Sequence, residues 1–157
     1  GKLGLLIAQV IGRISQRTTL VGKHPSALRL VEGMNINLKT LNAFKKGAKK
    51  GLQVVIECTG SPAGLKLAKE IVAPRGTIVL KSTYTRNTSF EFSDLVVNEV
   101  TLIGSRCGPF PLALRMLNRG EVSVRPLISA TFHLEDGLKA FQETLNKKTV
   151  KVLLRIP

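Results

Sequence analysis

The sequence predicts an α/β fold with a parallel sheet, and three observations lead to this prediction. Short apolar runs typical of buried strands alternate with helical patterns along the chain. These runs are almost continuously apolar, which is typical of parallel strands covered on both faces. The chain has 157 residues, of which 43% are hydrophobic, so it can bury one sizeable core. We therefore expect one globular unit.

The first predicted helix begins directly after the first glycine of the chain. Its apolar residues recur at helical spacing and predict one buried stripe, which consists of Leu3, Leu6, Ile7, Val10 and Ile14. The residues Thr18–Val21 then form a short apolar run that ends at Gly22 and predicts a strand. A second helix should follow Pro25, because proline is favoured in the first turn of a helix.

Three further strands are predicted in the middle of the chain. The first is Leu52–Cys58, and it should lead into a helix from Pro62 to about Val72. That helix is expected to end before the turn residues Pro74–Gly76. The runs Thr77–Leu80 and Val100–Gly104 predict the next two strands.

The pattern changes after Gly120. The segment Pro126–Phe132 is predicted to be extended, and Val150–Ile156 is predicted to be the last strand. Between them, Glu135 and Asp136 should open a helix, since acidic residues favour the N-terminal end of the helix dipole. The apolar stripe of this helix consists of Leu134, Leu138, Phe141 and Leu145.

The formal net charge of +14 indicates affinity for polyanions, but charge alone does not distinguish nucleic acid, a membrane surface or the phosphates of a cofactor. The densest basic run covers residues 45–51, and its only aromatic neighbour is Phe44. Single-strand binders stack bases on aromatic side chains, which are scarce here. We therefore interpret this run as a solvated connection and do not expect nucleic acid as a partner.

Membrane insertion and disulfides are not expected. The apolar segment Leu5–Ile11 is too short to cross a bilayer and is interrupted by Gln9. The two cysteines, Cys58 and Cys107, are far apart and suggest neither a disulfide framework nor a metal clip. A reducing compartment, the cytoplasm, fits this pattern best.

The first four residues, Gly1-Lys2-Leu3-Gly4, have the spacing of a phosphate-binding turn. A dinucleotide site needs a strand, a tight glycine turn and a helix N-terminus in that order. Here the strand and the first glycine would precede residue 1. We therefore expect a Rossmann-like doubly wound parallel sheet, truncated at its N-terminal strand, with Gly1, Lys2, Leu3 and Gly4 as phosphate contacts. The alternative is that the glycines only start a packed helix.

The choice of cofactor depends on the residues that follow the strand Thr18–Val21. At this position a carboxylate would bind a ribose 2′-hydroxyl group, whereas basic groups would accept a 2′-phosphate. The sequence has Gly22, Lys23 and His24 there, without a carboxylate. We therefore expect these three residues to bind the cofactor and NADP(H) to be favoured over NAD(H). The alternative is that Lys23 is a surface residue and His24 starts a helix.

Four further residues follow predicted strands at the edge where open parallel sheets bind ligands; they are Thr59, Gly60, Lys81 and Ser82. We expect them to contribute to the cofactor site. Arg106 could approach the nicotinamide or a phosphate, although an exposed arginine is the commoner outcome. Cys58 is interpreted as a small hydrophobe, Cys107 lacks a nearby histidine to activate it, and His133 is interpreted as structural.

Five stretches occur in the order seen in the medium-chain dehydrogenase/reductase family of the zinc alcohol dehydrogenase type. The glycine turn and first helix of that family resemble Gly1–Gln9, and its loop after the fourth strand resembles Val55–Pro62. The turn into its fifth strand is similar to Ala73–Leu80, its closing helix to Leu134–Phe141, and its last strand to Lys151–Leu154. Together these stretches span nearly the whole chain.

The resemblance implies an NADP(H)-dependent oxidoreductase that transfers hydride between a nicotinamide and an alcohol, aldehyde or ketone. Family members also carry an N-terminal catalytic domain with Cys, His and acidic zinc ligands, which this sequence lacks. We therefore expect residues 1–124 to form an incomplete dinucleotide-binding domain and residues 125–157 to pack on a catalytic domain outside this chain, with an apolar face left partly exposed. Zinc is implied only for that domain, and this chain alone is expected to be inactive.

Two alternatives stay open. The chain could belong to a zinc-free quinone reductase type, although its glycine turn differs from the alanine-rich version of that group. It could also be a basic, non-catalytic binding module that kept the fold. A homo-oligomer is a further possible partner state. In a doubly wound sheet the first strand is central, so a chain without it should be unstable or self-associating.

Overall fold

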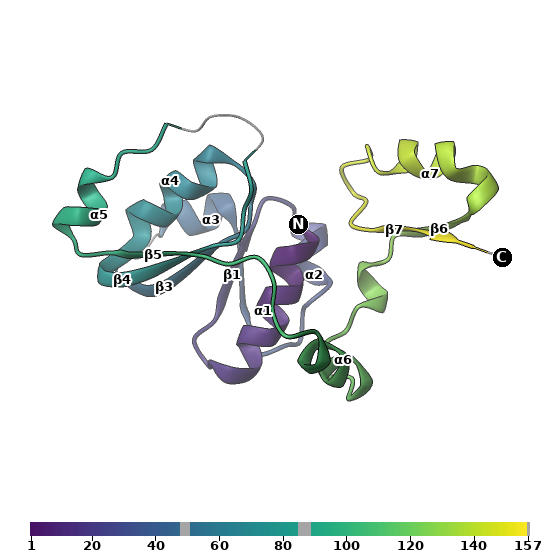
Figure 1. Ribbon diagram of the computed structural model, residues 1–157, viewed down its shortest axis with the longest axis horizontal. Coiled ribbons are helices and arrows are strands. Elements are labelled where there is room, and N and C mark those ends of the chain that lie inside the picture. Colours follow the sequence, from purple (N-terminus) through teal and green to yellow (C-terminus); the bar gives the residue numbers. More distant parts are fainter. Residues whose placement is uncertain (48–50, 85–88, 157) are drawn as a thin grey trace. The chain divides into compact units, whose positions relative to one another are not determined.

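The computed structural model describes residues 1–47, 51–84 and 89–156 (Figure 1). The chain divides into two compact units. The first unit consists of Gly1–Phe44 and Pro109–Pro157, and the second unit is Lys45–Gly108. The first unit is therefore discontinuous, because the second unit is inserted between its two parts. Residues 48–50 of the basic run lie outside the described residues, so its interpretation as a solvated connection stays a prediction.

The second unit contains a three-stranded parallel sheet in the order β3-β4-β5. These strands are Leu52–Glu57, Val72–Leu80 and Thr101–Gly104. The helix α4, Pro62–Ile71, lies across one face of the sheet, and the short helix α5, Ser93–Val97, precedes β5. Apolar side chains from two helices and the central strand form the core of this unit; they are Ala68, Leu95 and Ile78.

The strand β4 begins earlier than the sequence predicted. We expected a turn at Pro74–Gly76 and a strand only from Thr77, but the strand starts at Val72, directly after α4. The register between β3 and β4 shifts after Leu52, and Arg75 has a φ of 61°. Pro74–Gly76 therefore form a bulge within β4, because five residues of β4 lie opposite two residues of β3 at this point.

The first unit begins with the helix α1, Lys2–Ile14, and the strand β1, Thr19–Gly22. The short helix α2, Pro25–Arg29, then leads to β2, Asn37–Thr40, which pairs with β1 in parallel. The helix α3, Leu41–Lys46, follows at once. The strand β2 was not predicted, because its sequence Asn-Leu-Lys-Thr contains only one apolar residue.

The predicted stripe of α1 is wrong, because the helix buries a different face. Leu3 is 41% exposed and Ile14 is 79% exposed. A Cβ atom at Gly12 would lie 2.8 Å from Ile36 Cγ1 and 3.1 Å from the Asn35 carbonyl oxygen. The helix thus approaches its neighbours closely through small residues. Its buried residues are Gly4, Leu5, Ala8, Gln9 and Gly12.

The C-terminal part of the first unit contains a strand–helix–strand motif. The strands β6, Ala130–His133, and β7, Val152–Arg155, pair in parallel, and the helix α7, Gly137–Glu143, connects them. The helix α6, Phe110–Asn118, was not predicted. The extended segment predicted from Pro126 is wrong at its beginning, because Arg125–Leu127 forms a 3-10 turn.

Long-range contacts join the two parts of the first unit. Leu127 packs with Leu5 and Val31 in one buried cluster. The Gln9 side chain is 3% exposed; its Nε2 donates to the Ser123 carbonyl oxygen at 3.0 Å, and its Oε1 accepts from the Ser123 N–H at 2.7 Å. The buried amide is thereby satisfied at both of its ends.

The α/β fold with parallel strands is confirmed, but the strands form three separate sheets. Their orders are β1-β2, β3-β4-β5 and β6-β7, and among the described residues no strand pairing joins them. Within the described ranges, no helix has the length and apolar character needed to cross a bilayer.

Candidate cofactor-binding site

The carboxyl ends of β3, β4 and β5 form a polar edge of the second unit's sheet. The last paired residues of the three strands are Glu57, Leu80 and Gly104. The backbone hydrogen bonds between the strands continue one step further. The Lys81 N–H donates to the Glu57 carbonyl oxygen at 2.8 Å, and the Ser105 N–H donates to the Leu80 carbonyl oxygen at 3.0 Å. This register brings four predicted residues to one edge; they are Thr59, Gly60, Lys81 and Ser82.

Glu57 is a buried carboxylate at the end of the outer strand β3, with 3% of its surface exposed. Its Oε1 accepts hydrogen bonds from the Thr59 N–H at 2.7 Å and the Thr59 hydroxyl at 2.6 Å, and its Oε2 accepts from the Tyr84 hydroxyl at 2.8 Å. Burial raises the pKa of Glu57, but hydrogen bonds from Ser82, Thr59 and Tyr84 outweigh it and hold the pKa below its ordinary value. Glu57 is therefore an ionised group stabilised by neutral donors.

Tyr84 is the neutral counterpart of Glu57. Burial and the hydrogen bond to Glu57 raise the pKa of Tyr84 to about 12, so its hydroxyl group keeps its proton at neutral pH. Sequence reasoning missed both residues. A signal existed for Glu57, because it is the only charged residue in the apolar run Leu52–Cys58. No sequence pattern indicated that Tyr84 would reach back to it.

The loop after β3 is held by hydrogen bonds to the segment after β4. Gly60 has a φ of 69°, and its N–H donates to the Ser82 hydroxyl at 2.8 Å. Ser61 caps α4 by accepting a hydrogen bond from the Gly64 N–H at 3.2 Å, as expected for a serine before a proline at a helix start. A Cβ atom at Gly64 would lie 2.7 Å from Glu57 Oε1, so the first turn of α4 presses against the buried carboxylate.

The Lys81 side chain crosses from the end of β4 to the end of β5. Its Nζ donates to the Ser105 hydroxyl at 3.2 Å and to the Arg106 carbonyl oxygen at 2.9 Å. Both acceptors are neutral, and within the described part of the chain Lys81 forms no ion pair. The ammonium group is therefore not ion-paired with a described carboxylate, although the ionised Glu57 lies at the same edge.

The other predicted residues belong to the first unit. Gly1 is the N-cap of α1, and the first helical hydrogen bond runs from the Leu5 N–H to the Gly1 carbonyl oxygen at 3.2 Å. The N–H groups of Lys2, Leu3 and Gly4 consequently have no partner within the helix, and they lie at its positive end. Gly1, Lys2 and Leu3 are exposed, whereas Gly4 is buried. Such free amides suit an anionic ligand.

The predicted 2′-phosphate residues lie at the carboxyl end of β1. Gly22 is the last residue of this strand and is paired with Thr40 of β2. His24 is the N-cap of α2, and its carbonyl oxygen accepts from Leu28 at 3.3 Å. The side chains of Lys23 and His24 are both exposed, and Lys23 forms no ion pair with the described carboxylates. The lysine is therefore available to an anion.

The remaining candidates do not form a reactive centre. Cys58 is half-buried, and burial raises the pKa of its thiol group, which disfavours a reactive thiolate. Cys107 and Arg106 are exposed, and His133 ends β6. In the ranges 1–47, 51–84 and 89–156, no cluster of three or more His, Cys, Asp and Glu side chains could hold a metal ion.

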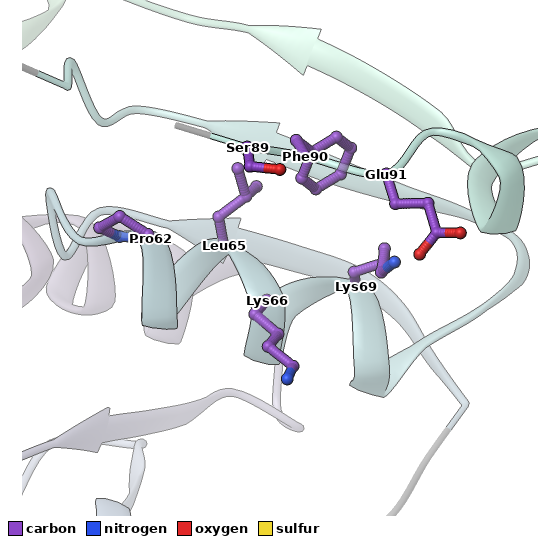
Figure 2. A pocket seen from close by; sticks show the side chains of 7 residues that line it. All are labelled: Pro62, Leu65, Lys66, Lys69, Ser89, Phe90 and Glu91. Carbon is purple, nitrogen blue, oxygen red and sulfur yellow. The ribbon is translucent and has the colours of Figure 1, made fainter. Parts of the chain in front are cut away.

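A separate pocket of about 210 Å³ runs along α4 and contains none of the predicted residues (Figure 2). One of its two ammonium groups is already engaged, because Lys69 Nζ lies 2.6 Å from Asp94 Oδ2 and 5.7 Å from the centre of the Phe90 ring. The pocket is lined by Pro62, Leu65, Lys66, Lys69, Ser89, Phe90 and Glu91.

Parallel strands joined by helices, a glycine-capped helix N-terminus and a polar carboxyl edge define a Rossmann-like α/β protein. Comparison with known families then identifies the family. A model of zinc-binding dehydrogenases matches residues 3–119, so the chain belongs to that family. The resemblance to medium-chain dehydrogenases is thus confirmed.

Individual proteins agree with this assignment. Sorbitol dehydrogenase from Pongo abelii is 31% identical over 99% of this chain and 46% of its own length. A putative zinc-binding dehydrogenase from Sinorhizobium meliloti bound to NADP has a TM-score of 0.85 at 24% identity, covering 100% of this chain and 50% of that chain. A short chain alcohol dehydrogenase from E. coli CFT073 complexed with NADH has a TM-score of 0.83 at 21% identity, covering 99% of this chain and 50% of that one. The chain spans about half the length of the relatives that it matches.

Proposed function

We propose that this chain is the cofactor-binding part of an NADP(H)-dependent, alcohol dehydrogenase-like oxidoreductase. Family membership supports the nicotinamide cofactor. The observation that carries the choice of NADP(H) is the carboxyl end of β1, where the exposed residues Lys23 and His24 stand in place of a carboxylate. The structural neighbours do not decide this choice, because one is bound to NADP and another to NADH.

Each predicted residue has a role in this proposal. The free N–H groups of Lys2, Leu3 and Gly4, beside Gly1, bind phosphate, and Lys23 and His24 after Gly22 bind the 2′-phosphate. The edge formed by Thr59, Gly60, Lys81 and Ser82 binds the nicotinamide half. When bound, the nicotinamide ring accepts or donates a hydride, and the chain's own residues hold and orient it.

The substrate and the zinc site belong, in this proposal, to the part of the relatives that this chain does not span. An alcohol or carbonyl compound is the proposed substrate of the whole protein, since a matched relative is a sorbitol dehydrogenase. The donor set of the described residues does not fit a zinc ion. Residues 125–157 would pack on that other part through the exposed side chains Leu138 and Phe141 of α7.

The cofactor assignment predicts that the chain binds NADPH more tightly than NADH and that Lys23→Ala removes most of this difference. A lysine hydrogen-bonded to phosphate contributes about 1.5–3 kcal/mol, so we expect NADPH binding to weaken about tenfold to a hundredfold while NADH binding stays constant. Titration calorimetry of the purified chain with both nucleotides measures this.

Arg17→Ala is the matched control, because Arg17 is an equally exposed cation that precedes β1 instead of following it. It should leave both affinities unchanged. Equal affinity for NADPH and NADH would refute the 2′-phosphate assignment. Salt-sensitive retention on nucleic acid without nucleotide binding would favour the basic binding module instead.

A further inference from the structure

The carboxyl edge of the second unit contains a cation, Lys81, whose hydrogen bonds within the described residues all go to neutral groups. Lys81 Nζ is fixed by the Ser105 hydroxyl at 3.2 Å and the Arg106 carbonyl oxygen at 2.9 Å. An ammonium group has three N–H donors, so one donor is left after these two bonds. The two bonds also restrict the flexible side chain to the space between the ends of β4 and β5.

The carboxylate at the end of β3, Glu57, does not form an ion pair with this cation. The Glu57 carboxylate accepts hydrogen bonds from Thr59 and Tyr84, and the Lys81 N–H donates to the Glu57 carbonyl oxygen. No described carboxylate forms an ion pair with Lys81. Glu57 is buried beneath its own hydrogen-bond donors, whereas Lys81 is only partly buried, so a ligand at this edge meets the ammonium group before the carboxylate.

We propose that Lys81 makes the site prefer the reduced cofactor over the oxidised one. This inference rests on the proposed function, in which the edge that includes Lys81 binds the nicotinamide half of the dinucleotide. The oxidised nicotinamide ring carries a positive charge and the reduced ring is neutral. A fixed ammonium group at this edge repels the oxidised ring only, while its remaining N–H donor suits a carbonyl oxygen in either form.

The expected size of the effect follows from Coulomb's law. Two unit charges about 10 Å apart in a partly solvated protein edge interact enough to change a ratio of affinities by about threefold to tenfold at low salt. The phosphates of the two nucleotides are identical, so their contribution cancels in the ratio of the Kd values for NADP+ and NADPH. That ratio isolates the charge of the ring.

The test measures this ratio by titration of the purified chain and of three variants. Lys81→Met should lower the ratio about threefold to tenfold, whereas Lys81→Arg keeps the charge and should preserve it. Lys66→Met is the control, because Lys66 is an exposed lysine of α4 away from the strand ends. If Lys81 only supports the fold, its replacement by methionine should weaken the binding of both nucleotides equally and leave the ratio constant.

A second measurement does not depend on any variant. Raising the salt concentration screens the ammonium group, so the ratio for the unsubstituted chain should fall with salt and level off. An unchanged ratio in a folded Lys81→Met variant, or a ratio independent of salt, overturns the inference and leaves the proposed function standing. Failure of the unsubstituted chain to bind either nucleotide overturns the proposed function, and this inference with it.

Discussion

Glu57 and Lys81 carry opposite charges at the same edge of the second unit's sheet, but their surroundings differ. Glu57 is buried and receives hydrogen bonds from Thr59, Tyr84 and Ser82. Lys81 is only partly buried and donates to neutral oxygens. The carboxylate thus joins the loops that follow β3 and β4, whereas the ammonium group is available to a ligand.

Replacing Glu57 by glutamine tests its role in joining these loops. Glu57→Gln places an amide N–H₂ group opposite N–H or hydroxyl donors, so one buried hydrogen bond is lost or reversed. We expect the free energy of unfolding to fall by about 1–3 kcal/mol, measured by urea denaturation. Glu70→Gln is the control, since Glu70 is exposed on α4, and it should have no measurable effect.

The same substitution changes the response to acid. Because the folded-state pKa of Glu57 is lowered, its contribution is complete above the ordinary pKa of a glutamate and is lost as the pH falls through the folded-state pKa. The unsubstituted chain should therefore lose more stability than the glutamine variant over this acidic range. Parallel losses in both chains would show that Glu57 is not responsible.

Sequence reasoning located some residues of this edge and missed others for a physical reason. Thr59, Gly60, Lys81 and Ser82 could be placed because they follow apolar runs, and the ends of parallel strands lie at one edge. Whether they bind a cofactor stays a prediction. Tyr84 was missed because its partner Glu57 is 27 positions away, and local periodicity contains no information about such contacts.

At the scale of the element, α4 combines a helix start with a tight contact. Its third residue, Gly64, lies where a Cβ atom would approach Glu57 Oε1 to 2.7 Å. Glycine is normally unfavourable in a helix by about 1 kcal/mol relative to alanine. Its presence here is explained by the approach of the helix to the loop after β3.

We therefore predict that Gly64→Ala destabilises the chain despite the better helix propensity of alanine. Overpacking of this kind costs about 1–3 kcal/mol, which urea denaturation can measure. Gly137→Ala is the matched control, because Gly137 opens α7 and a Cβ atom there would have nothing within 4 Å. It should be neutral or slightly stabilising, and an equal response of both variants would contradict the steric explanation.

The sequence predicts well those elements that contain several consecutive apolar residues. The strands β3 and β5 begin and end within one residue of the expected bounds, because several consecutive apolar residues define them. The strand β2 was missed because its pairing with β1, and not its composition, makes it a strand. The stripe of α1 was predicted wrongly because the helix packs through small residues, which hydrophobic periodicity does not weigh.

At the scale of the molecule, the C-terminal segment exposes large apolar side chains. The expectation that the C-terminal helix leaves an apolar face partly exposed is confirmed, with Leu138 82% and Phe141 71% exposed. The separate two-stranded sheets also leave outer strand edges without partners in their own sheets. Both features favour contact with another protein surface.

We predict that the isolated chain self-associates through α7. Replacing Leu138 and Phe141 by lysine should shift the chain toward the monomer, as measured by sedimentation velocity over a range of concentrations. Gln142→Lys is the control, since it adds charge on the same helix without removing apolar surface. A sharp thermal transition that is independent of concentration, in a chain that is already monomeric, would contradict this prediction.

The hydrogen bonds between Gln9 and Ser123 have a consequence for biosynthesis. During synthesis, the Ser123 backbone groups that satisfy the Gln9 amide emerge from the ribosome 114 residues after Gln9. The second unit, Lys45–Gly108, is continuous and can complete its own contacts in the meantime. The second unit should therefore fold before the first unit, because α1 becomes fully enclosed only after the C-terminal part has been synthesised.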